Sequence, residues 1–132
     1  ADLEVTLSTT DADFVVKLID VWPDNTEYPG YQMLVRGDIM RGRYRRSFSA
    51  PEPFTPGEPT EVAFTMPDIA HTFRKGHRIM VQVQSSWFPL ADRNPQQFVD
   101  IYRCAASDFI PCDVRIYHDR RRPSRLEVLR LR

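Results

Sequence analysis

The chain has 132 residues, the length of one domain, and its 42% hydrophobic and 27% charged residues are ordinary proportions for a globular protein. Its 18 basic residues balance its 18 acidic residues, which argues against a dedicated nucleic-acid or membrane-surface binder, because such proteins usually carry a basic excess. No apolar run approaches the roughly 20 residues that a membrane-spanning helix requires.

The first elements in chain order are expected to be strands. Residues 3–7 alternate apolar and polar side chains, as a half-buried strand does. Residues 14–22 are apolar on both faces apart from one lysine and one aspartate, which is typical of a central strand covered on both sides. A strand over 31–39 follows, in which Gly37 marks a bulge or a close approach. Because the chain starts without Met and reads as a strand already under way, we expect it to be a piece of a longer protein.

The middle of the chain begins with a proline-rich connection and returns to strands. Residues 47–59 contain four prolines and are expected to be irregular, whereas 60–66 alternate as a strand. Residues 67–73 are compatible with one helical turn, and 77–84 form the next alternating strand. That strand places on one face Ile79, Val81 and Val83.

Three more short strands are expected, over 97–103, 114–117 and 125–131. Eight or so short strands with proline-rich turns, and no amphipathic helix of useful length, predict an all-β sandwich or barrel formed by residues 1–132. A connection as long as 47–59 is easier to accommodate in a jelly roll than in an up-and-down barrel, so we favour a jelly-roll β-sandwich.

An aromatic loop follows the strand over 77–84. Trp87 and Phe88 are large apolar residues, although a loop tip is normally polar because its backbone stays hydrated. The loop is therefore predicted to be a contact site with another protein surface rather than a reaction centre. The candidate interface residues are Ser86, Trp87, Phe88, Pro89, Leu90, Asp92, Arg93 and Asn94.

The charged end of this loop resembles a catalytic cluster only superficially. Asp and Asn side chains bond their own backbone in turns, and Arg forks onto carboxylates. We therefore expect Asp92 and Asn94 to shape the loop and Arg93 to pair with an acid, in preference to contacting a substrate.

Catalysis by this chain alone is not expected. None of the glycines flanks a serine at Gly-x-Ser-x-Gly spacing, and His71, His77 and His118 are interpreted as structural or surface residues. We predict neither a catalytic residue, nor a metal, nor a cofactor. Cys104 and Cys112 have no neighbouring ligands at zinc-site spacing, and whether they form a disulfide depends on the compartment, which the sequence leaves open.

Arginines supply nearly all of the positive charge and cluster around one strand end. Since the net charge is zero and no exposed aromatic residues are interleaved, this stripe favours ion pairing with the acids or with a partner domain over a phosphate track. The arginines concerned are Arg36, Arg41, Arg43, Arg45 and Arg46.

Four motifs occur in an order that resembles a known family. They cover residues 13–21, 41–45, 76–83 and the run 85–95, which contains Ser-Ser-Trp-Phe-Pro followed by Asp-Arg-Asn-Pro. Together they resemble the C-terminal domain of the X-Pro dipeptidyl peptidase, cocaine esterase and α-amino-acid ester hydrolase group of serine hydrolases. The similarity extends from about Leu3 to the end of the chain, and the ester hydrolase-like members are the most similar.

The resemblance implies a galactose-binding-domain-like jelly roll that accompanies a helical cap and an α/β-hydrolase domain bearing a Ser-His-Asp triad. It implies that this hydrolase domain lies upstream of the present chain and that the jelly roll begins before Ala1, so that an opening strand is missing here. The expected partner is the hydrolase domain of the same parent protein, on which this domain packs to help shape the substrate cleft or an oligomer.

Two alternatives from other classes stay open. One is an autonomous carbohydrate- or peptide-binding module, which requires Trp22, Tyr31 and Trp87 to line one concave face. The other is a purely structural domain for homo-oligomerisation, which requires a large self-complementary surface. Neither nucleic acid nor a membrane is expected as a partner.

Overall fold

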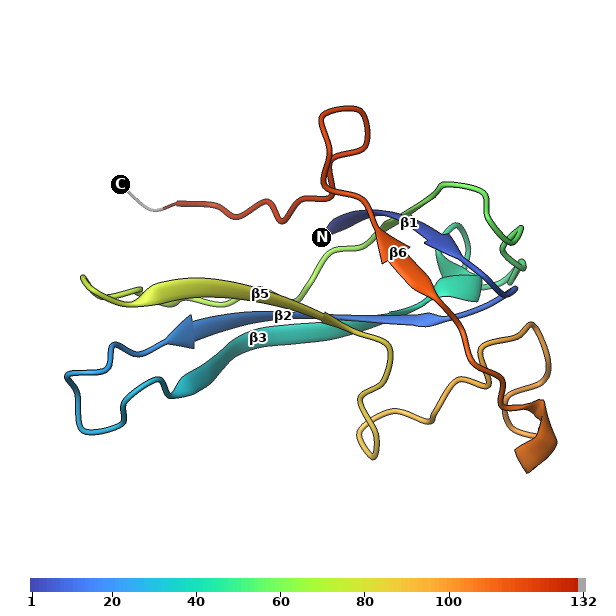
Figure 1. Ribbon diagram of the computed structural model, residues 1–132, viewed down its shortest axis with the longest axis horizontal. Coiled ribbons are helices and arrows are strands. Elements are labelled where there is room, and N and C mark those ends of the chain that lie inside the picture. Colours follow the sequence, from blue (N-terminus) through green and yellow to red (C-terminus); the bar gives the residue numbers. More distant parts are fainter. Residues whose placement is uncertain (131–132) are drawn as a thin grey trace.

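Figure 1 shows the computed structural model, which describes residues 1–130 as two layers of antiparallel β-sheet. The shorter sheet has the strand order β4–β1–β6, formed by Thr60–Ala63, Asp2–Leu7 and Val114–Ile116. The longer sheet has the order β3–β2–β5, formed by Gln32–Arg41, Asp13–Val21 and Arg78–Gln84. Two single-turn 3-10 helices are η1 (Gly42–Tyr44) and η2 (Ala106–Asp108). The all-β sandwich prediction is confirmed, while the jelly-roll connectivity stays a prediction.

The core lies where the short sheet crosses one end of the long sheet. The alternating apolar residues of β1 pack against Phe14 and Val16 of β2, and each such side chain contributes roughly 1.5–3 kcal/mol when buried. The other buried members of this cluster are Ala12, Met40, Phe54 and Val62. Within residues 1–130, no helix is long and apolar enough to cross a membrane.

β2 is the central strand of the long sheet, as its sequence predicts. It pairs with β3 on one side and β5 on the other, and all of its residues except Lys17 are buried. The pairing with β3 slips by one residue between Leu18 and Ile19, so the bulge lies at Val35 and not at Gly37.

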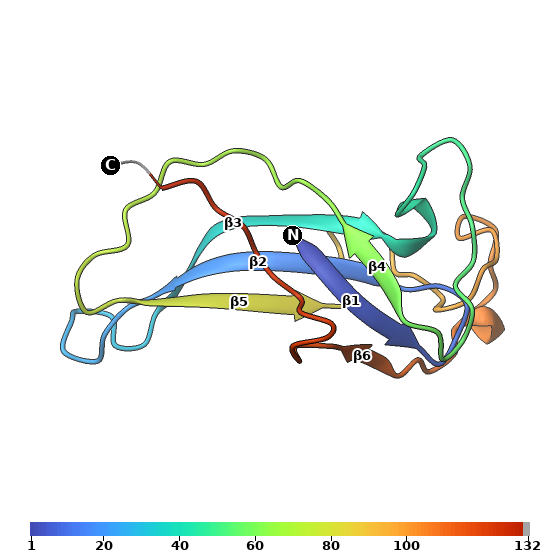
Figure 2. The ribbon, with the colours of Figure 1, turned by 90° about the horizontal axis from the view of Figure 1, so that it is seen from above.

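The short sheet covers only one half of the core-side face of the long sheet. Figure 2 shows β1 and β4 above one half of β2 and β3. Consequently Val83 packs against the core, whereas Ile79 and Val81 on the same face of β5 are 64% and 47% exposed. Their alternation correctly indicates a strand, but not burial.

The predicted strand over 97–103 is wrong. Its amide groups are used in local turns: Val99 N–H donates to the Gln97 carbonyl, and Arg103 N–H to the Asp100 carbonyl. The Asp100 side chain also accepts from the Tyr102 N–H. Short-range hydrogen bonds of this kind compete with strand pairing, and here they replace it.

Two other sequence-based expectations also fail. Residues 67–73 form no helical turn. In the predicted strand over 125–131, Arg125 makes a single antiparallel bridge with Asp2, and residues 126–130 have no strand structure. Residue 131 of that prediction lies outside the described residues.

Candidate domain interface

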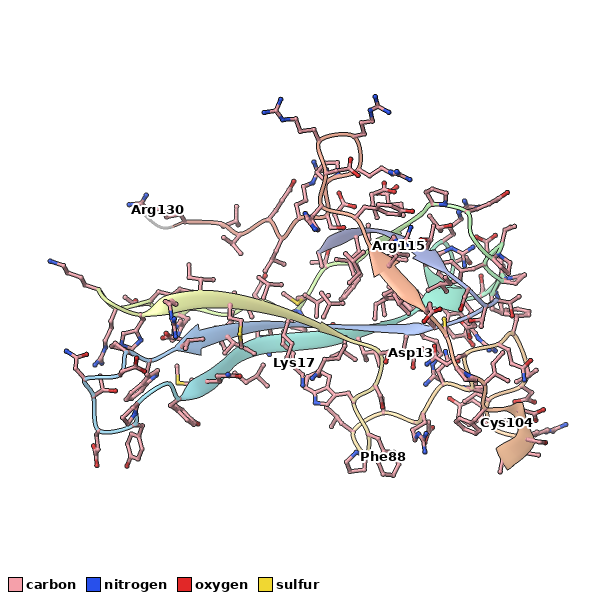
Figure 3. The ribbon with its side chains drawn as sticks, viewed as in Figure 1. Asp13, Lys17, Phe88, Cys104, Arg115 and Arg130 are labelled. Atoms are coloured by element: carbon pink, nitrogen blue, oxygen red, sulfur yellow. The ribbon has the colours of Figure 1, made fainter. Side chains whose placement is uncertain are left out.

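The loop of residues 85–95 leaves the end of β5 and descends on the face of the long sheet opposite the core (Figure 1). Phe88 lies at its far end (Figure 3), and the Phe88–Pro89 peptide bond is cis. Phe88 is 65% exposed and Leu90 is 72% exposed, and Pro89 between them is exposed as well. We call Phe88, Pro89 and Leu90 the apolar tip of the loop.

Trp87 faces its own sheet instead of solvent. The Lys17 ammonium lies 4.8 Å from the centroid of the Trp87 ring. A Cβ placed on Gly37 would come within 2.8 Å of Cη2 of Trp87, so the indole packs where the strand has no side chain. The close approach expected at Gly37 is confirmed, and Trp87 acts as the anchor of the loop.

Asn94 anchors the other end of the loop in a buried polar cluster. Its Nδ2 donates to Oδ1 of Asp13 at 2.8 Å and to Oδ2 of Asp11 at 3.1 Å. Its Oδ1 accepts from the Gln96 N–H at 2.8 Å, so the side chain also shapes the turn, as expected. Because all three acidic and amide side chains are buried, each hydrogen bond avoids leaving a polar group unsatisfied.

Two arginines of the sequence stripe neutralise this cluster. Arg43 is buried and its Nε lies 2.7 Å from Oδ2 of Asp11. Arg41 pairs with Asp13 at 3.3 Å and also donates to the backbone carbonyl of Asp92 at 3.1 Å, which ties down the loop. Burial raises the pKa of Asp13 above its ordinary value and outweighs the Asn94 hydrogen bond and the Arg41 charge, which lower it.

The rest of the arginine stripe also has partners within the chain. Arg45 and Arg46 both pair with Glu52, at 3.1 and 3.2 Å, and Arg36 donates to the backbone carbonyl of Asp68 at 2.8 Å. The interpretation of the stripe as ion-pairing residues is confirmed for four of its five members, while Arg36 uses a carbonyl.

Ser86, Asp92 and Arg93 of the predicted set are exposed. The Arg93 guanidinium lies over the Phe109 ring, 5.2 Å from its centroid. None of the ion pairs within residues 1–130 includes Arg93, so the expected pairing of Arg93 with an acid is not found among these residues. The loop thus presents to solvent an apolar tip and a cation.

A second polar cluster, which the sequence reading missed, surrounds Asp20 of β2. His71 Nε2 lies 2.9 Å from one carboxylate oxygen and His77 Nδ1 lies 2.8 Å from the other. Burial raises the pKa of Asp20, but the hydrogen bonds and charges of the two histidines outweigh it and lower that pKa below its ordinary value. The available signal was an aspartate within an apolar strand, because a buried carboxylate requires partners.

The histidines and cysteines have structural surroundings. His71 and His77 serve as hydrogen-bonding groups, and His118 is exposed, as the sequence reading proposed. Cys104 and Cys112 are both free thiols. Within the described part of the chain, no group of three His, Cys, Asp or Glu side chains is arranged to hold a metal ion.

Comparison with known proteins shows the family to which this chain belongs. Residues 1–127 match the X-Pro dipeptidyl-peptidase C-terminal non-catalytic domain. The chain is 45% identical over 94 residues to cocaine esterase from Rhodococcus sp. (strain MB1 Bresler), a match that covers 71% of this chain and 16% of that protein.

Two solved structures are similar over nearly the whole chain, each at 45% identity. One is an aminopeptidase from the marine sediment archaeon Thaumarchaeota archaeon, with a TM-score of 0.89 over 93% of this chain and 21% of that one. The other is a selenomethionine-labelled α-amino acid ester hydrolase, with a TM-score of 0.88 over 92% of this chain and 21% of that one. The chain spans at most 21% of the length of these relatives. The sequence resemblance is confirmed, and the chain belongs to the family of X-Pro dipeptidyl-peptidase C-terminal non-catalytic domains.

Proposed function

We propose that this chain is the accessory C-terminal domain of a longer serine hydrolase and that its 85–95 loop packs on the α/β-hydrolase domain of that protein. The family is described as non-catalytic, and the similar proteins are named as an esterase, an aminopeptidase and an ester hydrolase. In the parent, a Ser-His-Asp triad outside these residues would attack an ester or peptide carbonyl and form an acyl-enzyme that water then hydrolyses.

The observation that carries this proposal is the apolar tip on an anchored loop. Trp87 packs on the sheet and Asn94 is held by two carboxylates, so the tip between them is presented on a fixed base. Burying Phe88 and Leu90 against a partner would contribute roughly 1.5–3 kcal/mol each. Because the loop is ordered beforehand, little conformational entropy opposes that gain.

The proposed role is to position the hydrolase domain, not to take part in bond cleavage. A loop that packs beside the substrate cleft would steady its rim, so its loss would alter substrate binding as well as stability. This role requires no second copy of the domain, because one hydrolase domain of the same parent protein suffices as the partner. A homo-oligomer is a separate proposal, which size measurement of the longer protein would test.

The alternative of an autonomous sugar-binding module has less support. Trp22 meets Tyr31 edge to face, with ring centroids 5.8 Å apart and planes at 86°, beyond the end of β2. Trp87 lies instead against Lys17 and Gly37 in the middle of the sheet. Rings arranged in this way provide no common flat platform for a sugar.

The first test of the proposal is genetic. The reading frame upstream of Ala1 is expected to encode an α/β-hydrolase domain with a Gly-x-Ser-x-x-type nucleophile segment. A natural gene that begins at this domain and contains no such segment would contradict the accessory role.

The second test is hydrogen exchange on the longer protein and on the present chain. The amides of Trp87, Phe88 and residues 90–92 are expected to exchange more slowly in the longer protein, because the partner domain covers them. The turn at 119–122, whose amides at Arg121 and Arg122 already donate to Asp119, serves as the internal control and should not change. Equal exchange of the loop in both proteins would refute the packing.

A further inference from the structure

The 85–95 loop forms one wall of a pocket of about 340 Å³, and residues 109–111 form part of its lining. We call this cavity the Arg93 pocket. Its polar lining includes Ser85, Ser86, Arg93 and Gln96, and its apolar lining includes Phe109 and Ile110. The pocket therefore combines one cation, two hydroxyls and an apolar floor, and no carboxylate is among its lining residues.

Arg93 is available for an anion. Its guanidinium lies over the Phe109 ring, 5.2 Å from the ring centroid, a contact that uses none of its N–H donors. Those donors form a fork that matches a carboxylate. Since Arg93 is in none of the ion pairs among residues 1–130, its charge is unmatched within the described chain.

Gln96 adds a second and independent feature. Its Oε1 is buried and has no hydrogen-bond partner, which costs about 1–3 kcal/mol for a polar group removed from water. Its backbone has a φ of 66°, a left-handed conformation that is uncommon for a residue with a side chain. The Asn94 side chain holds this turn by accepting from the Gln96 N–H. The pocket lining therefore includes one residue that has a left-handed backbone and an incompletely hydrogen-bonded side chain.

We propose that the Arg93 pocket receives an acidic peptide segment of the partner hydrolase domain. The segment's carboxylate pairs with Arg93, and an adjacent apolar side chain packs on Phe109 and Ile110. The unmatched cation selects an acidic occupant, and the loop that carries the apolar tip also supplies Ser85, Ser86 and Arg93 to the pocket lining. The identity of the partner rests on the proposed function, whereas the chemistry of the occupant rests on the pocket alone.

The test uses two short peptides and the isotope-labelled 132-residue chain. The probe is N-acetyl-Leu-Glu-N-methylamide, and the matched control is N-acetyl-Leu-Gln-N-methylamide, which has the same shape without the charge. Each is titrated to about 10 mM, roughly ten times the dissociation constant of about 1 mM expected for one ion pair with a small apolar contact. Nuclear magnetic resonance follows the Arg93 side-chain N–H and the amides of Ser85, Ser86 and Gln96.

The glutamate peptide is expected to shift these signals and to bind about tenfold more tightly than the glutamine peptide, the ratio that corresponds to one charge-assisted hydrogen-bonded pair. Arg93→Gln should remove this tenfold preference. Arg103→Gln should retain it, because Arg103 is an exposed arginine that does not line the pocket.

Equal binding of the two peptides, shifts confined to other surfaces, or no shifts at the highest concentration would overturn the proposal. So would an Arg93→Gln chain that keeps the preference. If that variant does not fold, the comparison of the two peptides on the unaltered chain still decides. A positive titration with no hydrolase domain upstream would refute the assigned partner alone, and a negative titration with that domain present would refute the pocket alone.

Discussion

Replacement of Arg43 by leucine tests whether the buried cluster beneath the loop is organised as described. Arg43 is buried, its Nε lies 2.7 Å from Asp11, and its Nη1 donates to the Val99 carbonyl at 2.8 Å. Arg43→Leu retains much of the apolar stem but leaves the Asp11 carboxylate buried with Asn94 as its remaining donor, at 3.1 Å. Removal of one member of a buried ion pair typically costs 3–5 kcal/mol, so we expect a loss of about 4 kcal/mol in the free energy of unfolding.

The matched control is Arg46→Leu. Arg46 is 72% exposed and pairs with the half-exposed Glu52 at 3.2 Å, so its loss should cost about 1 kcal/mol or less. Adding Asp11→Asn to Arg43→Leu should restore part of the stability, because a buried amide costs less than a buried unpaired charge.

Urea unfolding of these chains, extrapolated linearly to water, provides the comparison. A typical domain is stable by only 5–15 kcal/mol, so a loss of about 4 kcal/mol is readily resolved. If Arg43→Leu is no more destabilising than Arg46→Leu, or if Asp11→Asn adds a further loss to Arg43→Leu, the description of the cluster is incorrect.

Three other expectations follow from the same geometry. The pKa of Asp20 is lowered in the folded chain, so its contribution to stability is present above the unfolded pKa of about 3.9 and is lost as pH falls toward the lower folded value. Between about pH 6 and pH 3, the free energy of unfolding should therefore fall less steeply for Asp20→Asn than for the unaltered chain. Equal slopes for the two chains would contradict this expectation. Gly37→Ala should displace Trp87 and cost about 1–3 kcal/mol, with a shift of the Trp87 indole N–H signal; an unchanged signal and stability would mean that the indole is not packed there. Combined Phe88→Ser and Leu90→Ser should change the stability of this chain by less than about 0.5 kcal/mol per site, and a larger loss in urea unfolding would show that the tip packs within the chain.

The strands were predictable where local periodicity and long-range pairing agree. β2 is apolar on both faces and is indeed the central strand, with neighbours on both sides. The segment 97–103 has a strand-like composition, but Asp100 and Gln97 provide nearby acceptors that close turns instead. Residues 79 and 81 alternate correctly, yet their exposure depends on how far the short sheet extends, which one strand's sequence does not contain.

The candidate site was predictable as a segment but not as an arrangement. An aromatic loop is visible in the sequence, whereas the inward turn of Trp87 depends on Gly37, 50 positions earlier, leaving space for the indole. The Asp20 cluster depends in the same way on His71 and His77, which lie 51 and 57 positions away. A sequence read alone indicates that a buried aspartate needs partners, but it does not identify partners so distant along the chain.

The loop contains one group of residues that contacts the rest of this chain and another that is exposed to solvent, and this division supports an interface role. Trp87 and Asn94 are committed to the sheet and to the buried cluster, so their replacement should disturb the loop even though they are largely inaccessible to a partner. Phe88, Leu90 and Arg93 are exposed, so we expect them to contribute little to the stability of this chain. Buried ion pairs are a weak source of stability, and we infer that this one is better explained by the fixed position it gives the loop. Replacement of Trp87 or Asn94 should therefore weaken partner binding by displacing the loop. Replacement of Phe88, Leu90 or Arg93 should weaken it by removing a direct contact.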